Sequence, residues 1–175
     1  MLIRDILSER DVVLDVLAPD KAAVLVRAAT LLARATGGDQ QTIGEALAAR
    51  EATGSTGFGS GIAIPHALVT GISTPTACLL LLNQPVAYEA IDDRPVDIAF
   101  GLLWPKQDTR GFLPGLAQIA RVLRSRGTRK LLRTAPTPAA ALAYLDQNTE
   151  VEVEVKVETV ADVRSPGRDL YLQDA

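Results

Sequence analysis

Two apolar stretches restrict the fold of this chain more than any other feature of its sequence. Residues 77–82 read ACLLLL and residues 96–104 read VDIAFGLLW, without the polar alternation of a strand that faces water on one side. Continuous apolar strands of this kind are typical of a sheet whose two faces are both covered. The segment between them, Ile91 to Pro95, has strong turn chemistry. We therefore expect other elements of the chain to cover both faces of these strands.

Strand and helix patterns alternate along the rest of the chain. A strand is predicted at 11–17, and a helix then opens at Pro19-Asp20 and ends before Gly37-Gly38, which suits a left-handed cap. The pattern Thr42-Ile43-Gly44-Glu45 resembles a capping box and predicts a second helix to about residue 51. Further helical patterns occupy residues 128–133, 138–146 and 108–124, the last with Leu113 on its apolar face. This alternation indicates an α/β fold.

Composition limits the classes of function. Hydrophobic residues make up 47% of the 175 residues, which is ample for a packed core, and the formal net charge is −3. No block of basic residues suggests nucleic acid as the main partner. The single cysteine excludes an internal disulfide, and neither a membrane span nor a signal-peptide core is visible. We expect a cytoplasmic protein that is peripheral to a membrane at most.

The stretch with the most distinctive chemistry is GSTGFGSGIAIPH at residues 54–66, which closes on the only histidine in the chain. Glycine permits positive φ angles and close approach of the backbone to a ligand, and successive N–H groups can converge on an anion. Arg50 lies just upstream, and its planar guanidinium suits a phosphate. These features indicate an imidazole beside an anion site, with Ser55, Thr56, Gly57, Gly59 and Gly61 in the surrounding loop.

Several other kinds of site do not match this stretch. Its spacing differs from that of a P-loop, of a dinucleotide-binding loop and of a G-x-S-x-G nucleophile elbow. His66 and Cys78 alone do not make a metal-ligand set, so we expect no metal. Residue chemistry by itself also leaves a structural interpretation open, in which the glycines only form turns and His66 only packs.

The stretch and its flanks resemble a known family. AREATGSTGFGSGIAIPHALV is similar to the active-site segment of enzyme IIA domains of the fructose/mannitol class, which belong to the bacterial phosphoenolpyruvate-dependent phosphotransferase system. The resemblance continues through NQPVAYEAIDDRPVDIAFGLLWP, and a free-standing chain is most similar to the nitrogen-regulatory branch. It implies a central mixed β-sheet flanked by helices on both faces. It covers residues 1–147 as one domain and leaves 148–175 as a C-terminal extension.

The resemblance also implies a mechanism. The phosphorylated histidine of the family matches His66, which would accept a phosphoryl group from a phosphohistidine carrier protein (HPr-like). The family's arginine matches Arg50, which would bind the phosphoryl oxygens. The group would then pass to a transporter domain in sugar transport, or remain as a signal to a regulatory target protein. Neither a cofactor nor a metal is implied, and the sugar or target cannot be identified from the sequence.

Two departures from the family stand out. Many members carry a second histidine near the start of the helix at 108–124, where this chain has Phe112. Phe112 cannot donate a hydrogen bond, so a second function stays open: a non-catalytic regulatory binding module with weakened phosphoryl transfer. Arg110, two residues away, could supply a substitute cation or be a solvated loop charge. In the extension, valines alternate with charged residues over 151–158, which predicts a strand at a sheet edge or at a contact between subunits.

Overall fold

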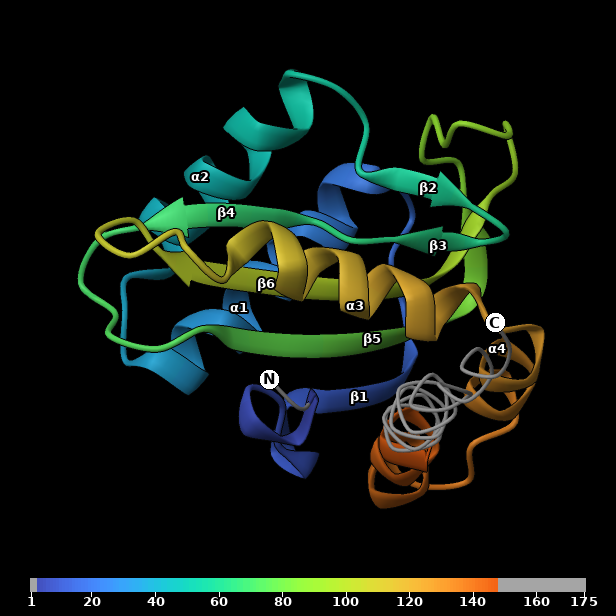
Figure 1. Cartoon of the computed structure of the whole chain (residues 1–175). Coiled ribbons are helices and arrows are strands. Elements are labelled where there is room, and N and C mark those ends of the chain that lie inside the picture. The colour runs from blue at the N-terminus through green and yellow to red at the C-terminus, as the bar shows by residue number, and fades with distance from the viewer. Residues whose placement is uncertain (1–2, 148–175) are drawn as a thin grey trace, which may run out of the picture.

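A computed structural model describes residues 3–147 and shows a mixed sheet between two layers of helices (Figure 1). The strand order is β1-β5-β6-β3-β2, and β4 also pairs with β6. β5 pairs antiparallel with β6, whereas β1 runs parallel to β5, and β3 and β4 run parallel to β6. The strands are β1 (Val12–Val16), β2 (Gly57–Gly59), β3 (Ile62–Ala63), β4 (His66–Val69), β5 (Thr76–Val86) and β6 (Val96–Pro105).

β3 and β4 are two short pieces that lie one after the other along β6. Ala63 pairs with Ala99 and His66 with Leu102, so the register along β6 is kept across the two residues between them. One of these is Pro65, which has no N–H to donate, although its carbonyl accepts from Leu102 at 2.9 Å. This break places His66 at the first position of a strand, with its backbone held by the sheet.

Helices α1 (Lys21–Thr36) and α2 (Gln40–Ala52) cover one face of the sheet. The side chain of Asp20 caps α1 by accepting from Ala23 N, and Gly37 ends it in the left-handed region at φ 71°. The apolar side of α1, including Val24, Ala28 and Leu32, packs on β5 and β6. α2 packs against α1 and β4.

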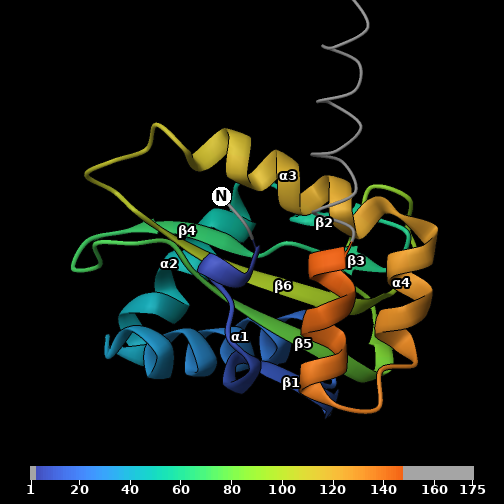
Figure 2. The same cartoon turned by 60° about the horizontal axis from the view of Figure 1, so that its bottom comes forward.

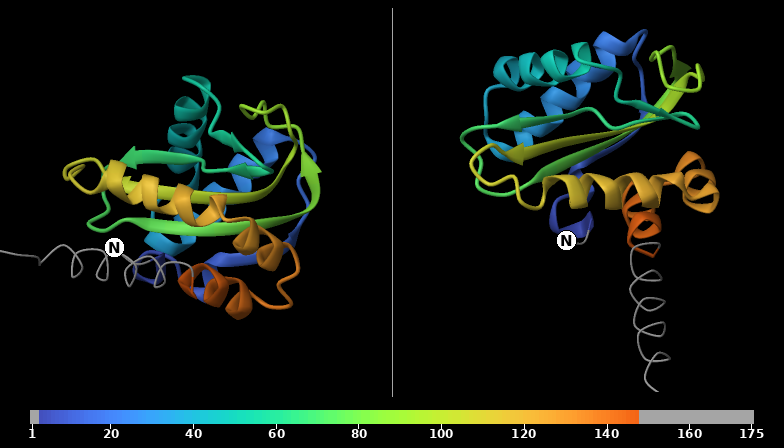
Figure 3. Two further views of the ribbon diagram at one scale, coloured as in Figure 1. Left: turned by 45° about the vertical axis from the view of Figure 1, so that its right-hand side comes forward. Right: turned by 45° about the horizontal axis from the view of Figure 1, so that its top comes forward.

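The opposite face is covered by α3 (Phe112–Arg124), the N-terminal turn η1 (Ile3–Asp5) and a helical segment at 138–147, whereas η2 (Glu9–Asp11) contacts α1 and β5. α4 (Arg126–Arg133) follows α3 and adds Leu132 to the same core. Figure 2 shows α3 on the other side of the sheet from α1, and the right-hand view of Figure 3 shows the three layers edge on. The predicted mixed sheet with helices on both faces is therefore confirmed.

The centre of the sheet requires one close approach between strands. Cys78 on β5 lies opposite Gly101 on β6, and a Cβ at position 101 would lie 2.6 Å from the Cys78 Sγ atom. Only glycine fits there without a shift of the neighbouring side chain. Cys78 is fully buried, and burial raises the pKa of its thiol to about 12.

Several local predictions need correction. The second helix begins after Asp39, whose side chain accepts from Thr42 N at 2.7 Å, so Thr42 lies inside the first turn and does not cap the helix. The third helix begins at Phe112, because Asp108 and Arg110 form a turn before it. Leu113, predicted on its apolar face, is 70% exposed. The predicted strand at 151–158 lies outside the described residues.

Candidate functional site

The packing of α2 on β4 brings Arg50 to His66. Arg50 lies in the last turn of α2, and its Nε donates to His66 Nε2 at 3.0 Å. A second nitrogen, Nη1, donates to Gly54 O at 3.0 Å and to Thr53 Oγ1 at 3.3 Å. These contacts fix the guanidinium between the end of α2 and the imidazole, so the two residues that the sequence selects do meet.

The hydrogen bonds of the His66 ring define its tautomer. Nδ1 lies 2.7 Å from the carbonyl oxygen of Ile64, which can only accept, so Nδ1 carries the proton. Nε2 faces the Arg50 guanidinium, which can only donate, so Nε2 carries the lone pair. The ring is therefore a neutral imidazole with its nucleophilic nitrogen beside a cation.

Burial supports the neutral form of this ring. His66 is only 7% exposed, and burial is the largest cause that lowers its pKa below the ordinary value. The nearby Arg50 cation lowers this pKa further, whereas the Ile64 carbonyl and the Glu51 carboxylate oppose the shift. At neutral pH the site therefore holds an uncharged nucleophile without the help of a carboxylate partner on the ring.

Behind the ring, a chain of hydrogen bonds leads back to a buried carboxylate. His66 Nδ1 donates to Ile64 O, Ile64 N donates to Thr56 O at 3.0 Å, and Thr56 N donates to both Glu51 oxygens at 3.0 and 3.2 Å. The Thr56 hydroxyl also donates to Glu51. Each hydrogen bond positions the next peptide group. Glu51 therefore helps to position the Ile64 carbonyl, which orients the imidazole of His66.

The charge of Glu51 has a cationic partner. Lys21 Nζ lies 3.2 Å from Glu51 Oε1 and 2.7 Å from Glu89 Oε2, and it lies 5.2 Å from the centre of the Tyr88 ring. Sequence reasoning selected none of these residues. The spacing of Lys21, Glu51 and Tyr88 carries no local signal, because only the tertiary fold brings them together. Their contacts make the start of the glycine-rich loop a fixed part of the structure.

The glycines and hydroxyls of that loop contact the segment at 88–97 in this structure. Ser55 Oγ donates to Tyr88 O at 2.9 Å, and a Cβ at Gly57 would lie 2.9 Å from Ala90. Gly59 and Gly61 belong to a tight hairpin turn between β2 and β3 in which Gly59, Ser60 and Gly61 all have positive φ. The assignment of Ser55, Thr56, Gly57, Gly59 and Gly61 as a loop around a phosphoryl group stays a prediction.

Phe112 packs directly against the imidazole. The two ring centroids lie 5.6 Å apart at an interplanar angle of 52°, and Trp104 lies 5.8 Å from Phe112 on its other side. The Phe112 position therefore adjoins His66, as the alignment with the family expects, and presents an apolar ring there. Arg110 forms a two-contact ion pair with Asp108 at 2.8 and 2.9 Å on the exposed turn, which matches the solvated-charge alternative.

Two further findings concern residues 3–147 only. No group of three or more histidine, cysteine or acidic side chains is arranged to hold a metal ion in that part of the chain. Likewise, none of its helices combines the length and apolar composition that a membrane crossing would need.

The mixed sheet and the Arg50–His66 pair at its edge agree with the result of comparing the chain with known families. The family profile described as "Phosphoenolpyruvate-dependent sugar phosphotransferase system, EIIA 2" matches residues 5–148 of the chain. The chain belongs to this family.

Within the family, the chain is similar to nitrogen regulatory proteins. It is 47% identical over 121 residues to one from Pseudomonas aeruginosa, which covers 69% of this chain and 79% of that protein. The crystal structure of nitrogen regulatory protein IIA-Ntr from Neisseria meningitidis superimposes with a TM-score of 0.78 at 33% identity, over 82% of this chain and 98% of the other. Mannitol IIA from Escherichia coli shares the fold, with a TM-score of 0.68 at 16% identity over 79% and 98% of the two chains.

Proposed function

We propose that this protein is a regulatory phosphocarrier that accepts a phosphoryl group on Nε2 of His66. The observation that carries the proposal is the pair of contacts on the ring: Nδ1–H donated to Ile64 O and Nε2 facing Arg50. Membership of the IIA family and the similarity to nitrogen regulatory proteins support the same conclusion.

In the proposed reaction, the Nε2 lone pair of His66 attacks the phosphorus of a phosphohistidine on the donor protein. The new Nε2–P bond forms as the donor's N–P bond breaks, and the donor imidazole leaves with the bonding electron pair. Nε2 has no proton to lose, and Nδ1 keeps its proton on Ile64 O. Arg50 stabilises the charge of the transferring phosphoryl oxygens, since in this chemistry positioning and electrostatics supply most of the catalysis.

The donor that fits this proposal is an HPr-like phosphohistidine carrier of the cytoplasm. The acceptor of the phosphate, or the partner that senses it, is a second protein. One related structure is a complex of mannitol enzyme IIA with phosphorylated enzyme IIB from Escherichia coli, which supports a protein partner. For this chain, the similarity to nitrogen regulatory proteins favours a regulatory target over a sugar transporter.

The test is intact mass spectrometry after incubation with phosphoenolpyruvate, enzyme I and the phosphohistidine carrier of the same organism. We expect a gain of one phosphate in the wild-type protein and none in His66→Ala. Because the chain has a single histidine, acid-labile phosphate on the wild type identifies the acceptor without peptide mapping. A folded wild-type protein that gains no phosphate from an active carrier would contradict the proposal.

The contact of Phe112 with His66 supports the second candidate, a binding module that transfers phosphate weakly. A histidine at position 112 would place a hydrogen-bonding ring where this chain has an apolar one. Phe112→His separates the two candidates, with Phe112→Leu as the matched control for loss of the aromatic ring. If only Phe112→His gains phosphate, the binding module is the better description; if the wild type is already phosphorylated, the phosphocarrier stands.

A further inference from the structure

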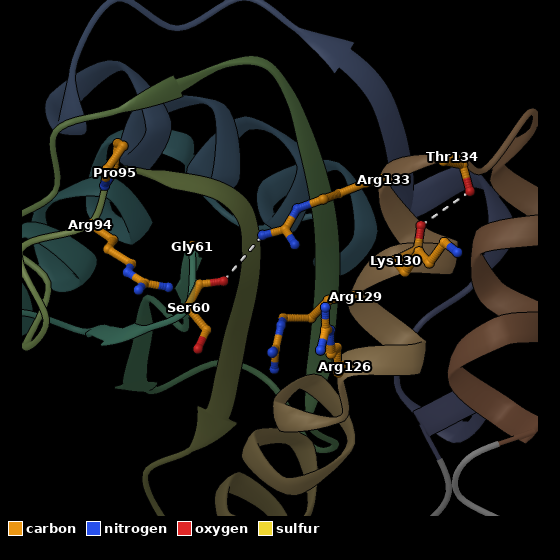
Figure 4. A pocket seen from close by; sticks show the side chains of 9 residues that line it. All are labelled: Ser60, Gly61, Arg94, Pro95, Arg126, Arg129, Lys130, Arg133 and Thr134. Carbon is orange, nitrogen blue, oxygen red and sulfur yellow. Dashed lines mark hydrogen bonds between the residues drawn. The ribbon is translucent and has the colours of Figure 1, made fainter.

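A second strongly charged feature lies beside Ser60 and Gly61, at the start of the segment that leads to His66. A hollow of about 620 Å³ lies between α4, the loop before β6 and the turn that joins β2 to β3. Its lining includes Arg94, Arg126, Arg129, Lys130 and Arg133, and Ser60 and Gly61 form the wall opposite α4. Figure 4 shows the guanidinium groups of Arg126 and Arg129 extending from α4 toward this wall, and that of Arg94 reaching toward Ser60.

The positive charge of this hollow is only partly balanced. Among its lining residues, all within 3–147, there is no acidic side chain. Asp97 pairs with Arg133 at 2.6 and 2.8 Å, and Asp92 lies 3.8 Å from Arg94. Arg126 and Lys130 have no carboxylate partner among the described residues. Five cations therefore converge in a chain whose net charge is −3.

The cations also repel one another. Burial, followed by the charges of Arg133 and Arg126, lowers the pKa of Arg129, and the charge of Asp97 opposes this shift. Arg129 Nη1 is held by the carbonyl oxygens of Leu123 and Arg124, so it cannot simply swing away into solvent. An anion in the hollow would relieve this repulsion, and guanidinium groups suit phosphate oxygens in both charge and geometry.

We propose that this hollow binds a compact small molecule that carries at least two phosphate groups. Its volume lies within the range of small-molecule sites, which is about 300–1,000 Å³. Three separate segments surround it, so the ligand is enclosed from several directions. The lining contains no aromatic side chain on which a base could stack, so the phosphate groups themselves carry the recognition.

This site is separate from the histidine site. Asp97, which pairs with Arg133, and Leu102, which pairs with His66, lie on the same strand β6. Five residues along a strand correspond to roughly 16 Å. The lining of the hollow includes neither His66 nor the two residues that bond its ring, Arg50 and Ile64. Binding at the hollow therefore does not require phosphorylation of His66.

The test is isothermal titration calorimetry of the full chain with inorganic pyrophosphate. Inorganic phosphate, which has one phosphate group instead of two, is the comparison ligand. We expect pyrophosphate to bind more tightly than phosphate, and binding to weaken as salt increases. Arg94→Gln/Arg126→Gln removes two cations that have little structural role. It should weaken pyrophosphate binding by about 100-fold, since each charge-assisted hydrogen bond contributes about tenfold.

Matched variants distinguish binding at a specific site from non-specific attraction to the positive charge of the protein. Arg27→Gln/Lys106→Gln makes the same change of charge at exposed positions outside the hollow and should leave the affinity unchanged. Arg94→Lys/Arg126→Lys keeps the charge and should retain part of the binding. His66→Ala should bind pyrophosphate as the wild type does, which keeps this test independent of phosphoryl transfer.

Three results would overturn the proposal. The first is no measurable binding of pyrophosphate to the folded wild-type protein. The second is an equal loss of affinity in Arg94→Gln/Arg126→Gln and Arg27→Gln/Lys106→Gln, which would show non-specific attraction. The third is a glutamate-rich peptide that binds more tightly than pyrophosphate and displaces it, which would identify the hollow as a docking surface for an acidic protein segment.

Discussion

The two ends of the segment from Ser60 to His66 differ in how their charges are balanced. At the His66 end, one arginine faces a neutral ring, and each ring nitrogen has a partner within the protein. At the Ser60–Gly61 end, five cations line an open hollow and share two neighbouring carboxylates. The first end is organised in advance around a nucleophile, whereas the second has charge left over for a ligand. The comparison predicts that internal contacts dominate mutational effects at the first end and ligand binding dominates them at the second.

The largest expected effect comes from Glu51, the buried carboxylate behind the His66 end. Glu51→Ala leaves the buried Thr56 N–H and hydroxyl without their acceptor, and leaves Lys21 with only its exposed partner Glu89. Loss of the acceptor for a buried donor costs up to about 3 kcal/mol of unfolding free energy. Urea denaturation followed by circular dichroism measures this change.

Glu89→Ala is the matched control for this prediction. Glu89 pairs with the same Lys21 Nζ atom but is exposed, and Lys21 lowers its pKa mainly through their hydrogen bond. We expect no resolvable change in the urea midpoint for this variant, because solvent screens exposed ion pairs. Equal midpoints for Glu51→Ala and Glu89→Ala would show that the chain of hydrogen bonds behind His66 does not stabilise the fold.

Arg50→Gln should reduce the rate of phosphoryl transfer to His66 by about 100-fold, which corresponds to about 2.7 kcal/mol. The reason is the loss of the cation that faces Nε2, while the fold keeps its other contacts. Quenched-flow measurement of phosphate incorporation gives the rate. Arg27→Gln removes an exposed arginine from α1 and should transfer phosphate as the wild type does. A rate for Arg50→Gln within a few-fold of the wild-type rate would assign the stabilisation of charge to another group.

A smaller effect is expected at the other end of the segment. Gly61→Ala would place a Cβ 2.6 Å from Arg133 Nη2 and 2.8 Å from Asp97 Oδ1, at a φ of 83°. We expect a loss of about 2 kcal/mol of unfolding free energy. Gly37→Ala has a similar φ of 71° with nothing within 4 Å, so it should lose only about 1 kcal/mol. Equal losses of unfolding free energy in the two variants would mean that the Arg133–Asp97 pair moves aside for the new Cβ at no cost in stability.

The smallest expected effect is a pH dependence carried by His66. Its pKa is lowered in the folded protein, so the unfolded chain binds this proton more readily. As the pH falls below about 6.5, the ordinary histidine value, this difference destabilises the fold until the pH passes the folded pKa. His66→Gln should lack this part of the decline below about pH 6.5.

Nuclear magnetic resonance can check the same shift directly, because the chain has one imidazole and its titration curve needs no assignment. We expect the midpoint to lie below the ordinary histidine value in the wild type and to rise in Arg50→Gln. A wild-type midpoint at or above the ordinary value would contradict the neutral, buried ring described above.

Local patterns predicted most of the fold. The apolar runs in β5 and β6, and the Asp20 and Gly37 ends of α1, depend on residues close in sequence, so pattern and structure agree. The start of α2 was mistaken because Asp39 and Thr42 both suit a cap, and only the backbone geometry distinguishes them. The β2–β3 hairpin was missed, although Ser60-Gly61 is a turn signal that was available.

The site was predicted less completely than the fold. Arg50 and His66 were identified by the resemblance to the family, and the structure brings them together. Lys21 and Glu51, which lie 3.2 Å apart, come from different helices, so no local spacing connects them. The basic hollow was missed for the same reason, because Arg94 and α4 belong to distant parts of the sequence.

The close approach of Cys78 to Gly101 makes the thiol of Cys78 a probe for opening of the central sheet. A thiol with a pKa near 12 and no exposed surface does not react with alkylating or disulfide reagents while the sheet is closed. It is the only cysteine of the chain, so any labelling measures how often the central strands separate. Labelling rates with and without pyrophosphate, and before and after phosphorylation, would therefore report how strongly each event tightens the middle of the sheet.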